Sequence, residues 1–323
     1  MNGCRKDPFQ PTPIGFTIPQ GFPQPQYNFL SNPLSEEGFQ LGKKLFFDGR
    51  LSKNGNFPCG SCHQPVAAFT TFEHDRSHGY NNSHTLRNAP GLFNLAWHPS
   101  FNQDGSATNL ETVIARHINE PREMGESVSN VVNKLKNDAQ YRSMFRAAFR
   151  DDGVTAERMF MALSQFLVSM VSAGSKYDAV KNGTASFNAQ EGAGYQVFQS
   201  KCGSCHTEPL FTDFSFRNTG LPLDAGLNDG GRIRVTGSLA DSMKFRVPSL
   251  RNVMLTSYYG HDGRFSLPRH MIVHYRTGVQ PGANVDPLVK NGIALTDEEE
   301  NNLVHFMRTL SDSTFLNNPR FRE

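Results

Sequence analysis

Tryptophan is nearly absent from this chain of 323 residues, which has one, Trp97, against 26 phenylalanines. An excess of charge of one sign is also lacking, because 32 Lys and Arg face 30 Asp and Glu for a formal net charge of +2. That balance argues against nucleic acid or an anionic membrane surface as the main partner. The apolar runs fall short of the ~18 residues that a membrane-spanning helix needs, so the sequence predicts no such helix.

Cysteine is scarce as well: the chain has five, and four of them lie in two Cys-Gly-Ser-Cys-His runs, residues 59–63 and 202–206. A Cys-x-x-Cys-His run is the attachment site of a c-type haem, whose vinyl groups take up the two thiols while the His ligates the iron. A Cys4 zinc site or a pair of disulfides would leave the His after each pair unexplained. The sequence therefore predicts two covalent haems, held by Cys59, Cys62 and His63 and by Cys202, Cys205 and His206.

The fifth cysteine, Cys4, precedes a proline-rich stretch at residues 8–33. Two interpretations of Cys4 stay open: the acylated first residue of a lipoprotein, with a start Met in place of its signal segment, or a residue of an untethered periplasmic protein. Export to the periplasm is inferred from the haem chemistry, since no signal peptide is visible. Residues 1–34 are expected to form an N-terminal extension or tether.

The two haem runs make the chain an internal repeat. Each run follows a segment with a helical pattern, at residues 36–47 and 189–199, and strand signals are weak throughout. The fold class is therefore predicted to be mainly α, with two cytochrome c-like domains that each carry one haem. We expect an N-terminal domain at residues 35–180 and a C-terminal domain at residues 181–323.

Further helices are indicated between and after the haem runs. Residues 127–149 and 155–172 show apolar residues at three-to-four spacing, which is typical of amphipathic helices. A last helix is expected to begin at Thr296, because Glu299 completes a capping-box pattern, and to end near Ser311. The segment 174–194 is rich in Gly, Ser and Asn and is expected to hold the domain boundary.

Other stretches occur in a fixed order around the haem runs. They are Leu41-Gly-Lys-Lys-Leu-Phe-Phe-Asp, Arg87-Asn88-Ala89-Pro90, Glu123-Met124-Gly125, Pro248-Ser-Leu-Arg-Asn-Val and His261-Asp262-Gly263. This set resembles the bacterial dihaem cytochrome c peroxidase family, which includes the MauG-type enzymes, over roughly residues 35–310. The resemblance implies that the second haem collects electrons and that the first haem meets peroxide at the domain interface.

Several residue roles follow from the resemblance. His63 and His206 match the proximal ligands, and His78 matches a loop His that caps the resting first haem and swings away on activation. His74 and His84 are weaker candidates for that cap, and a solvated loop side chain is the alternative for all three. Glu123 matches the distal carboxylate that shuttles the proton of peroxide; its alternative is a surface position in the charged run 120–126.

The resemblance also implies a calcium ion between the domains. Asn88 and Thr256 match its ligands, and hard oxygen donors of this kind suit the cation. Tyr258 stands where the family usually has Pro, and its backbone carbonyl would serve as a ligand.

The chain departs from the family pattern around both haems. Gln103 replaces the Trp between the haems, and Val113 replaces a distal Gln. His117 replaces a Pro beside the first haem, where a proton donor, an iron ligand and a packing role all stay open. Tyr275 stands where most peroxidases place the Met ligand of the second haem, and Tyr is the MauG-type choice.

The ligand of the second haem has competitors. Leu267, Met271 and Tyr275 recur every four residues, so Tyr275 as a core residue of one helix is the alternative. Met271, one turn earlier, would then be the sulfur ligand, with Met243 and Met254 as less favoured ones. A phenolate favours oxidised iron, whereas Met sulfur raises the reduction potential.

The leading hypothesis for function is a dihaem peroxidase that reduces hydrogen peroxide to water with electrons from a small c-type cytochrome or a similar periplasmic donor. A MauG-like enzyme that oxidises a protein substrate is the first alternative, and an electron-transfer cytochrome without turnover is the second. By analogy with the family, a homodimer is expected.

Overall fold

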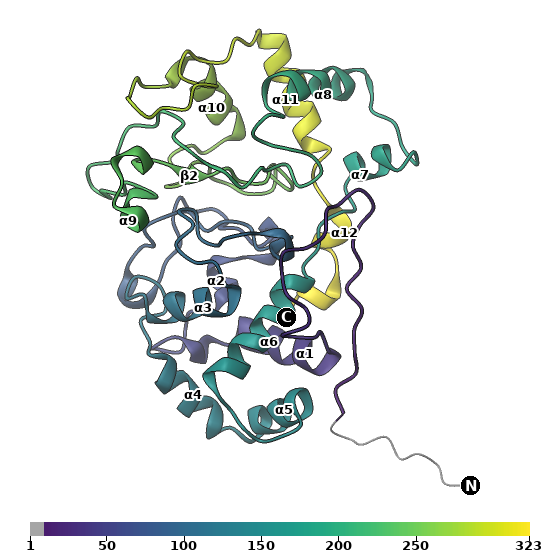
Figure 1. Cartoon of the computed structure of the whole chain (residues 1–323), viewed down its shortest axis with the longest axis vertical. Coiled ribbons are helices and arrows are strands. Elements are labelled where there is room, and N and C mark those ends of the chain that lie inside the picture. The colour runs from purple at the N-terminus through teal and green to yellow at the C-terminus, as the bar shows by residue number, and fades with distance from the viewer. Residues whose placement is uncertain (1–9) are drawn as a thin grey trace.

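The computed structural model describes residues 10–323, so Cys4 lies outside the described part. The predicted fold class, mainly α, is confirmed for these residues: helices and turns alternate with loops, and the strands are two short segments, β1 (Phe216–Arg217) and β2 (Phe245–Arg246). The two strands pair antiparallel, with Phe216 opposite Arg246. Figure 1 shows the elements in two parts stacked along the long axis.

The lower part in Figure 1 is formed by the first half of the chain. Its helices are α1 (Glu36–Phe47), α2 (Cys59–Cys62), α3 (Leu110–Asn119), α4 (Val128–Lys136), α5 (Ala139–Phe149) and α6 (Ala156–Ser169). The predicted helix at 127–149 is in fact two helices, because Asp138 caps a new start: its Oδ1 accepts hydrogen bonds from the backbone N–H of Gln140 at 2.7 Å and of Tyr141 at 3.1 Å.

The upper part contains the second haem run. Its helices are α7 (Lys176–Lys181), α8 (Ala189–Lys201), α9 (Ile233–Thr236), α10 (Pro268–Val273), the π-helical turn η6 (His274–Gly278) and α11 (Asp297–Arg308). The predicted capping box of α11 is confirmed: Thr296 Oγ1 accepts from Glu299 N–H at 3.1 Å, and Glu299 Oε2 accepts from Thr296 N–H at 2.8 Å. Segment 174–194, expected to be a boundary loop, contains α7 and the start of α8.

Phenylalanine fills two separate hydrophobic clusters, one in each part. Phe39, Phe46 and Phe166 lie in the first, and Phe198 and Phe306 lie in the second. In the second cluster α8 packs along α11. The expected division into domains at residues 180 and 181 stays a prediction; that point lies inside α7, and Tyr177 before it belongs to the second cluster.

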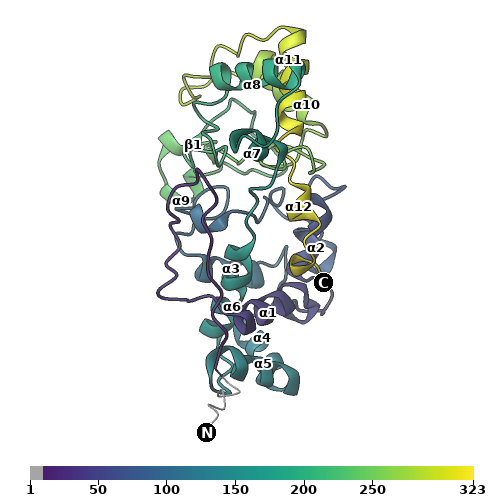
Figure 2. The ribbon, with the colours of Figure 1, turned by 90° about the vertical axis from the view of Figure 1, so that its right-hand side faces the viewer.

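Both ends of the described chain cross between the parts. Phe315, in α12 (Ser313–Leu316), and Phe321 follow α11 in sequence but lie in the first cluster. At the other end, Trp97 Nε1 donates a hydrogen bond to the carbonyl of Pro23 at 2.8 Å, and the Arg251 guanidinium lies 5.0 Å from the Phe22 ring centre. Figure 2 shows this N-terminal stretch running beside the lower part up to the level of α9 and back. The described part of the expected extension is therefore packed against both parts.

Among residues 10–323 we find no helix with both the length and the apolar character required to cross a bilayer.

Candidate haem sites at the seam

A cavity of about 860 Å³ extends along the seam between the two parts. Cys59, Cys62 and His63 line it from the lower part, and Cys202, Cys205 and His206 line it from the upper part. None of these four cysteines forms a disulfide, which removes that alternative to haem attachment. Burial raises the pKa of the Cys59 and Cys202 thiols, each to about 12. The structure therefore brings the two predicted attachment sites to one shared space.

The first histidine, His63, follows α2 and is held by two backbone carbonyls. Its Nδ1 lies 3.0 Å from the carbonyl oxygen of Phe69 and 3.0 Å from that of Pro90. A carbonyl accepts, so Nδ1 carries the proton and Nε2 is left with a free lone pair for a metal. Burial lowers the pKa of His63 to about 4, which keeps the ring neutral, as ligation requires.

The second histidine, His206, is held in the same way. Its Nδ1 lies 3.2 Å from the carbonyl oxygen of Phe211 and 3.1 Å from that of Pro248. Burial also lowers the pKa of His206. Both predicted proximal ligands thus have the tautomer and the neutral charge that iron ligation needs.

Buried polar atoms in the cavity wall also suit a large ligand that carries polar groups at its edge. His98 Nδ1 and Gln103 Oε1 are buried there without a protein partner. The guanidinium of Arg246 lies between the two parts, donates to the carbonyl of Ser100, and has a pKa that burial lowers to about 10. A porphyrin brings two carboxylates, which the Arg246 guanidinium and a protonated His98 Nδ1 would satisfy as donors, so the residues fit the group.

A hydrogen-bonded chain of three side chains lies in the first haem pocket. His117, in α3, places Nδ1 2.6 Å from Glu123 Oε2 and Nε2 3.2 Å from Asn102 Oδ1. Burial alone would lower the pKa of His117, but the charge and hydrogen bond of Glu123 outweigh it and raise the pKa. Val113, one turn before His117, lines the same wall. Two of the predicted catalytic residues, Glu123 and His117, are therefore brought together.

The third predicted catalytic residue, His78, is not among the residues that line the cavity. Its ring is exposed beside His74 and His84, with ring centres 4.9 and 4.4 Å away. The carbonyl of His78, and not its ring, faces the haem run, 3.8 Å from Cys62 Sγ. As a cap of the resting first haem, His78 stays a prediction that requires the loop to turn its ring inward.

The predicted calcium ligands lie at the seam but are engaged with the protein. Asn88 Nδ2 donates to the carbonyl of Asp75 at 2.8 Å, and Thr256 Oγ1 donates to the carbonyl of Thr71 at 3.3 Å. Tyr258 lines the cavity. Within the described residues, no group of three or more His, Cys, Asp or Glu side chains is placed to hold a metal ion. Calcium stays a prediction based on Asn88, Thr256 and Tyr258.

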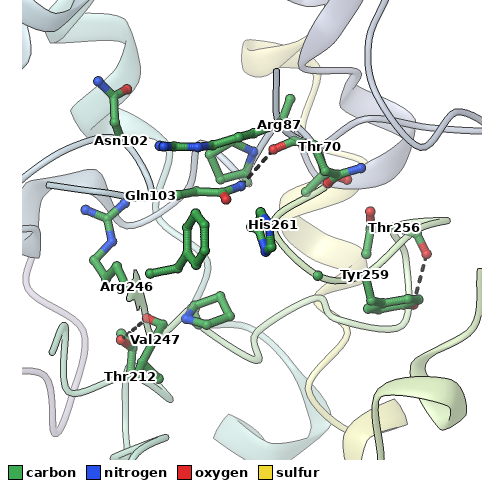
Figure 3. Close-up of a pocket in the computed structure, with 18 of the residues that line it drawn as sticks. Thr70, Arg87, Asn102, Gln103, Thr212, Arg246, Val247, Thr256, Tyr259 and His261 are labelled. Carbon is green, nitrogen blue, oxygen red and sulfur yellow. Dashed lines mark hydrogen bonds between the residues drawn. The ribbon is translucent and has the colours of Figure 1, made fainter. Parts of the chain in front are cut away.

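Between the two haem runs, the rings of Phe245 and His261 lie at the centre of the seam. Figure 3 shows Gln103 and Arg87 from one side facing Arg246 and His261 from the other. Gln103, at the position of the missing Trp, donates from Nε2 to the carbonyl of Asn88 at 2.8 Å. The rings of Phe245 and His261 stack with centres 3.8 Å apart.

Arg87 fixes this region by two ion pairs. One, at 2.7 Å, joins it to Asp104 in the lower part, and the other, at 2.6 Å, crosses the seam to Asp229. The Arg87 guanidinium is also 5.3 Å from the Phe245 ring centre. Sequence reasoning identified Arg87 only as part of a motif. It missed Asp229, Phe245 and Asn102, because nothing in the order of residues shows that these segments meet.

Tyr275 lines the second haem pocket from an unusual turn of helix. α10 continues into the π-helical turn η6, and Tyr275 is the second residue of that turn. Burial raises the pKa of Tyr275, and the neighbouring Cys202 and Cys205 raise it further. π-Turns inside helices are frequent at functional sites, which is compatible with a ligand role for Tyr275.

Two of the three methionines that compete with Tyr275 as the second haem ligand line the cavity as Tyr275 does, and the third does not. Met271 and Met243 also line the cavity, whereas Met254 packs against the second hydrophobic cluster and is absent from the cavity wall. Leu267 is the N-cap residue of α10 and is 53% exposed. The apolar helix face that was expected to include Leu267, Met271 and Tyr275 therefore begins only at Met271.

Comparisons with known proteins agree with this architecture. Residues 36–186 match the di-haem cytochrome c peroxidase family. The chain is 33% identical to methylamine utilization protein MauG of Methylorubrum extorquens over 91% of this chain and 83% of the relative. It is 35% identical to cytochrome c551 peroxidase of Nitrosomonas europaea over 72% of this chain and 70% of the relative.

Two solved structures share the fold. A MauG-like protein associated with microbial copper homeostasis superposes with a TM-score of 0.85 at 31% identity, covering 95% of this chain and 98% of that one. The diheme peroxidase BthA from Burkholderia thailandensis superposes with a TM-score of 0.76 at 23% identity, covering 88% of each chain. The paired haem runs, the shared cavity and these likenesses lead to one conclusion: this chain belongs to the di-haem cytochrome c peroxidase family, which includes MauG.

Proposed function

We propose that the protein reduces hydrogen peroxide to water at the first haem site, with electrons that enter at the second. The observation that carries this proposal is the pair of Glu123 and His117, 2.6 Å apart, in the same cavity wall as His63. A haem held by Cys59, Cys62 and His63 would supply the redox chemistry that peroxide reduction requires. The family implies two c-type haems, and Cys59, Cys62, Cys202 and Cys205 would attach them.

Glu123 and His117 together move the proton that peroxide cleavage requires. The carboxylate of Glu123 takes the proton from one peroxide oxygen and gives it to the other, and the imidazolium of His117 is its reserve at Nδ1. Asn102 Oδ1, 3.2 Å from Nε2, accepts from that nitrogen and so fixes which ring nitrogen faces Glu123. Arg246 would hold a haem carboxylate at the seam.

The cellular setting of the proposal follows the family. The electron donor is a small c-type cytochrome or a similar protein of the periplasm, where the enzyme would act. A lipid anchor at Cys4, a homodimer, the interdomain calcium ion and the cap formed by His78 belong to the same proposal, as does the division into domains at residues 180 and 181.

A second candidate function is oxidation of a protein substrate, as the likeness to MauG indicates. The observation that favours it is Tyr275 in the wall of the second pocket, since an anionic oxygen ligand would stabilise oxidised iron there.

Peroxide turnover in the presence of a reduced small cytochrome c separates the candidates. Rapid oxidation of that donor supports the peroxidase. Slow donor oxidation with peroxide-dependent change of the haem spectra supports the protein-oxidising enzyme. Haem spectra that do not respond to peroxide would leave an electron-transfer cytochrome.

A further inference from the structure

Two tyrosines converge on one carboxylate beside the second haem site. The hydroxyl of Tyr177 donates to Glu208 Oε2 at 2.7 Å, and the hydroxyl of Tyr195 donates to the same oxygen at 3.1 Å. Lys181 Nζ lies 3.2 Å from that oxygen and 3.1 Å from the Tyr195 hydroxyl. None of these four residues has a part in the peroxide chemistry proposed above.

Ring contacts connect this cluster to the iron ligand of the second site. The ring of Tyr177 meets that of Phe211 edge-on with centres 4.7 Å apart, and the carbonyl of Phe211 is the one that accepts from His206 Nδ1 at 3.2 Å. The ring of Tyr195 stacks on Phe198 with centres 6.5 Å apart. Phe198 lines the haem cavity, so one phenylalanine ring separates Tyr195 from that site, whereas Tyr177 is linked to it through Phe211 and the Phe211–His206 hydrogen bond.

The opposite side of the cluster opens to the surface. A pocket of about 240 Å³ is lined by Tyr177, Lys181 and Glu208, together with Phe22 of the N-terminal stretch and Pro209. The wall combines these apolar groups with Lys181 and two carboxylates, Glu208 and Asp178, of which Asp178 is paired with Arg251. Such a mixed wall suits a small aromatic molecule that carries a hydroxyl group.

The chemistry of a phenol makes the shared carboxylate significant. Burial raises the pKa of Tyr177, and its hydrogen bond to Glu208 raises it further, so the phenol keeps its proton at neutral pH. A protonated phenol gives up an electron readily only if its proton leaves at the same time. A carboxylate oxygen at 2.7 Å is a ready acceptor for that proton.

We propose that Tyr177, Tyr195 and Glu208 form an exit site at which oxidising equivalents from peroxide are passed to a small phenol or hydroquinone in the surface pocket. This inference rests on the proposed function, which supplies the oxidised haem centre.

In the first step one electron leaves Tyr177 for the oxidised haem centre, the phenolic O–H bond breaks, and its proton forms a new O–H bond on Glu208. In the second step the hydroquinone gives one electron to the phenoxyl oxygen, and Glu208 returns the proton. The hydroquinone, now a radical, releases its own proton to water. Two such cycles use the two oxidising equivalents of one peroxide molecule, which becomes two molecules of water.

Electron paramagnetic resonance of the haem-loaded protein tests the first step. After peroxide is added without a donor, the wild-type protein should show a tyrosyl radical. Tyr177→Phe should lose most of that signal, and Glu208→Gln should lose it while both phenol rings stay in place. In the wild type, peroxide should still change the haem absorption spectrum.

The chain offers a matched control in the first hydrophobic cluster. Tyr141 is also buried and donates to a carboxylate, Asp48 Oδ2, at 2.6 Å, but it belongs to the first cluster, whereas Tyr177, Phe198 and Phe211 belong to the second. Tyr141→Phe should leave the radical signal unchanged. A signal that survives Tyr177→Phe and Glu208→Gln, or that disappears in Tyr141→Phe instead, would overturn the exit site.

Steady-state turnover tests the second step. Tyr177→Phe should slow peroxide-dependent oxidation of hydroquinone but leave oxidation of a reduced small cytochrome c at the wild-type rate. Equal loss with both donors would overturn the inference. Haem spectra that do not respond to peroxide at all would overturn the proposed function and the exit site together, whereas a response without a Tyr177-dependent radical overturns the exit site alone.

Discussion

His63 and His206 are held alike, each with Nδ1 directed at two backbone carbonyls, at 3.0 and 3.0 Å in the first site and at 3.2 and 3.1 Å in the second. The side chains that share the cavity with them differ. The first site has the acid–base pair of Glu123 and His117, and the second has Tyr275 among apolar neighbours, with Met271, Ile293 and Leu303 in the wall. Attachment of the cofactor is thus duplicated, whereas its chemistry is set by the residues that are not repeated.

The largest expected difference between the two sites comes from removing one haem at a time. Intact mass spectrometry of the wild type should show two haem adducts, and replacing Cys59 and Cys62 by Ala, or Cys202 and Cys205 by Ala, should leave one. Loss of the first haem should abolish the peroxide reaction, whereas loss of the second should abolish only donor oxidation. A wild-type mass with fewer than two adducts would refute the paired sites.

The next effect concerns the acid–base pair. Glu123→Gln keeps the shape of the side chain but cannot carry a proton, so the reaction with peroxide should slow ~10²- to 10³-fold. Stopped-flow mixing with peroxide measures this rate. Glu120→Gln, in the same charged run, is the control and should stay near the wild-type rate. An equal rate for Glu123→Gln and wild type would remove Glu123 from the mechanism.

The second site is tested through its reduction potential. Tyr275→Met exchanges an oxygen ligand that favours oxidised iron for sulfur, so the potential of the second haem should rise by on the order of 100 mV. The potential of the first haem should not change. Spectroelectrochemical titration follows both haems. If Met271→Leu shifts the second potential and Tyr275→Met does not, the ligand is Met271.

The smallest expected effect is a pH dependence at the first site. Glu123 raises the pKa of His117 in the folded protein, so their ion pair stabilises the fold fully below the ordinary pKa of histidine, and this contribution is lost as the pH rises through the raised value. The His117 side chain is 45% exposed, so screening limits the contribution to about 0.5 kcal/mol.

Denaturant unfolding of the wild type and of His117→Gln measures that contribution. The difference in their free energies of unfolding should be larger near pH ~5.5 than near pH ~9, since the ordinary pKa lies near ~6.5. A difference that grows with pH would show that the neutral form of His117 is the one held in the fold.

The sequence predicts those features that depend on neighbours along the chain. The haem runs, the capping box of Thr296 and Glu299 and most helices are of this kind. The break at Asp138 could also have been found, because a cap residue stands in the middle of the predicted helix. The π-turn at Tyr275 could not, since it arises from how α10 continues against the rest of the second part.

Contacts across the seam were beyond the sequence. Arg87 meets Asp229 only because the two parts are packed as they are. Within the lower part, Asn102 meets His117 only because the loop before α3 lies against that helix. The family resemblance placed Glu123 and Tyr275 at the haems, but it gave no partner for His117, which departs from the family pattern. Likewise, the exposed ring of His78 depends on the conformation of one loop, which no residue pattern determines.

The position of Phe315 has a consequence for the order in which the protein matures. Its ring lies 5.8 Å from that of Phe69, and the carbonyl of Phe69 directs His63. The wall behind the first histidine is therefore completed by residues near the end of the chain. A haem attached to the first run before those residues are in place would join an unfinished pocket, and final seating of its iron ligand would wait for the last helix to dock.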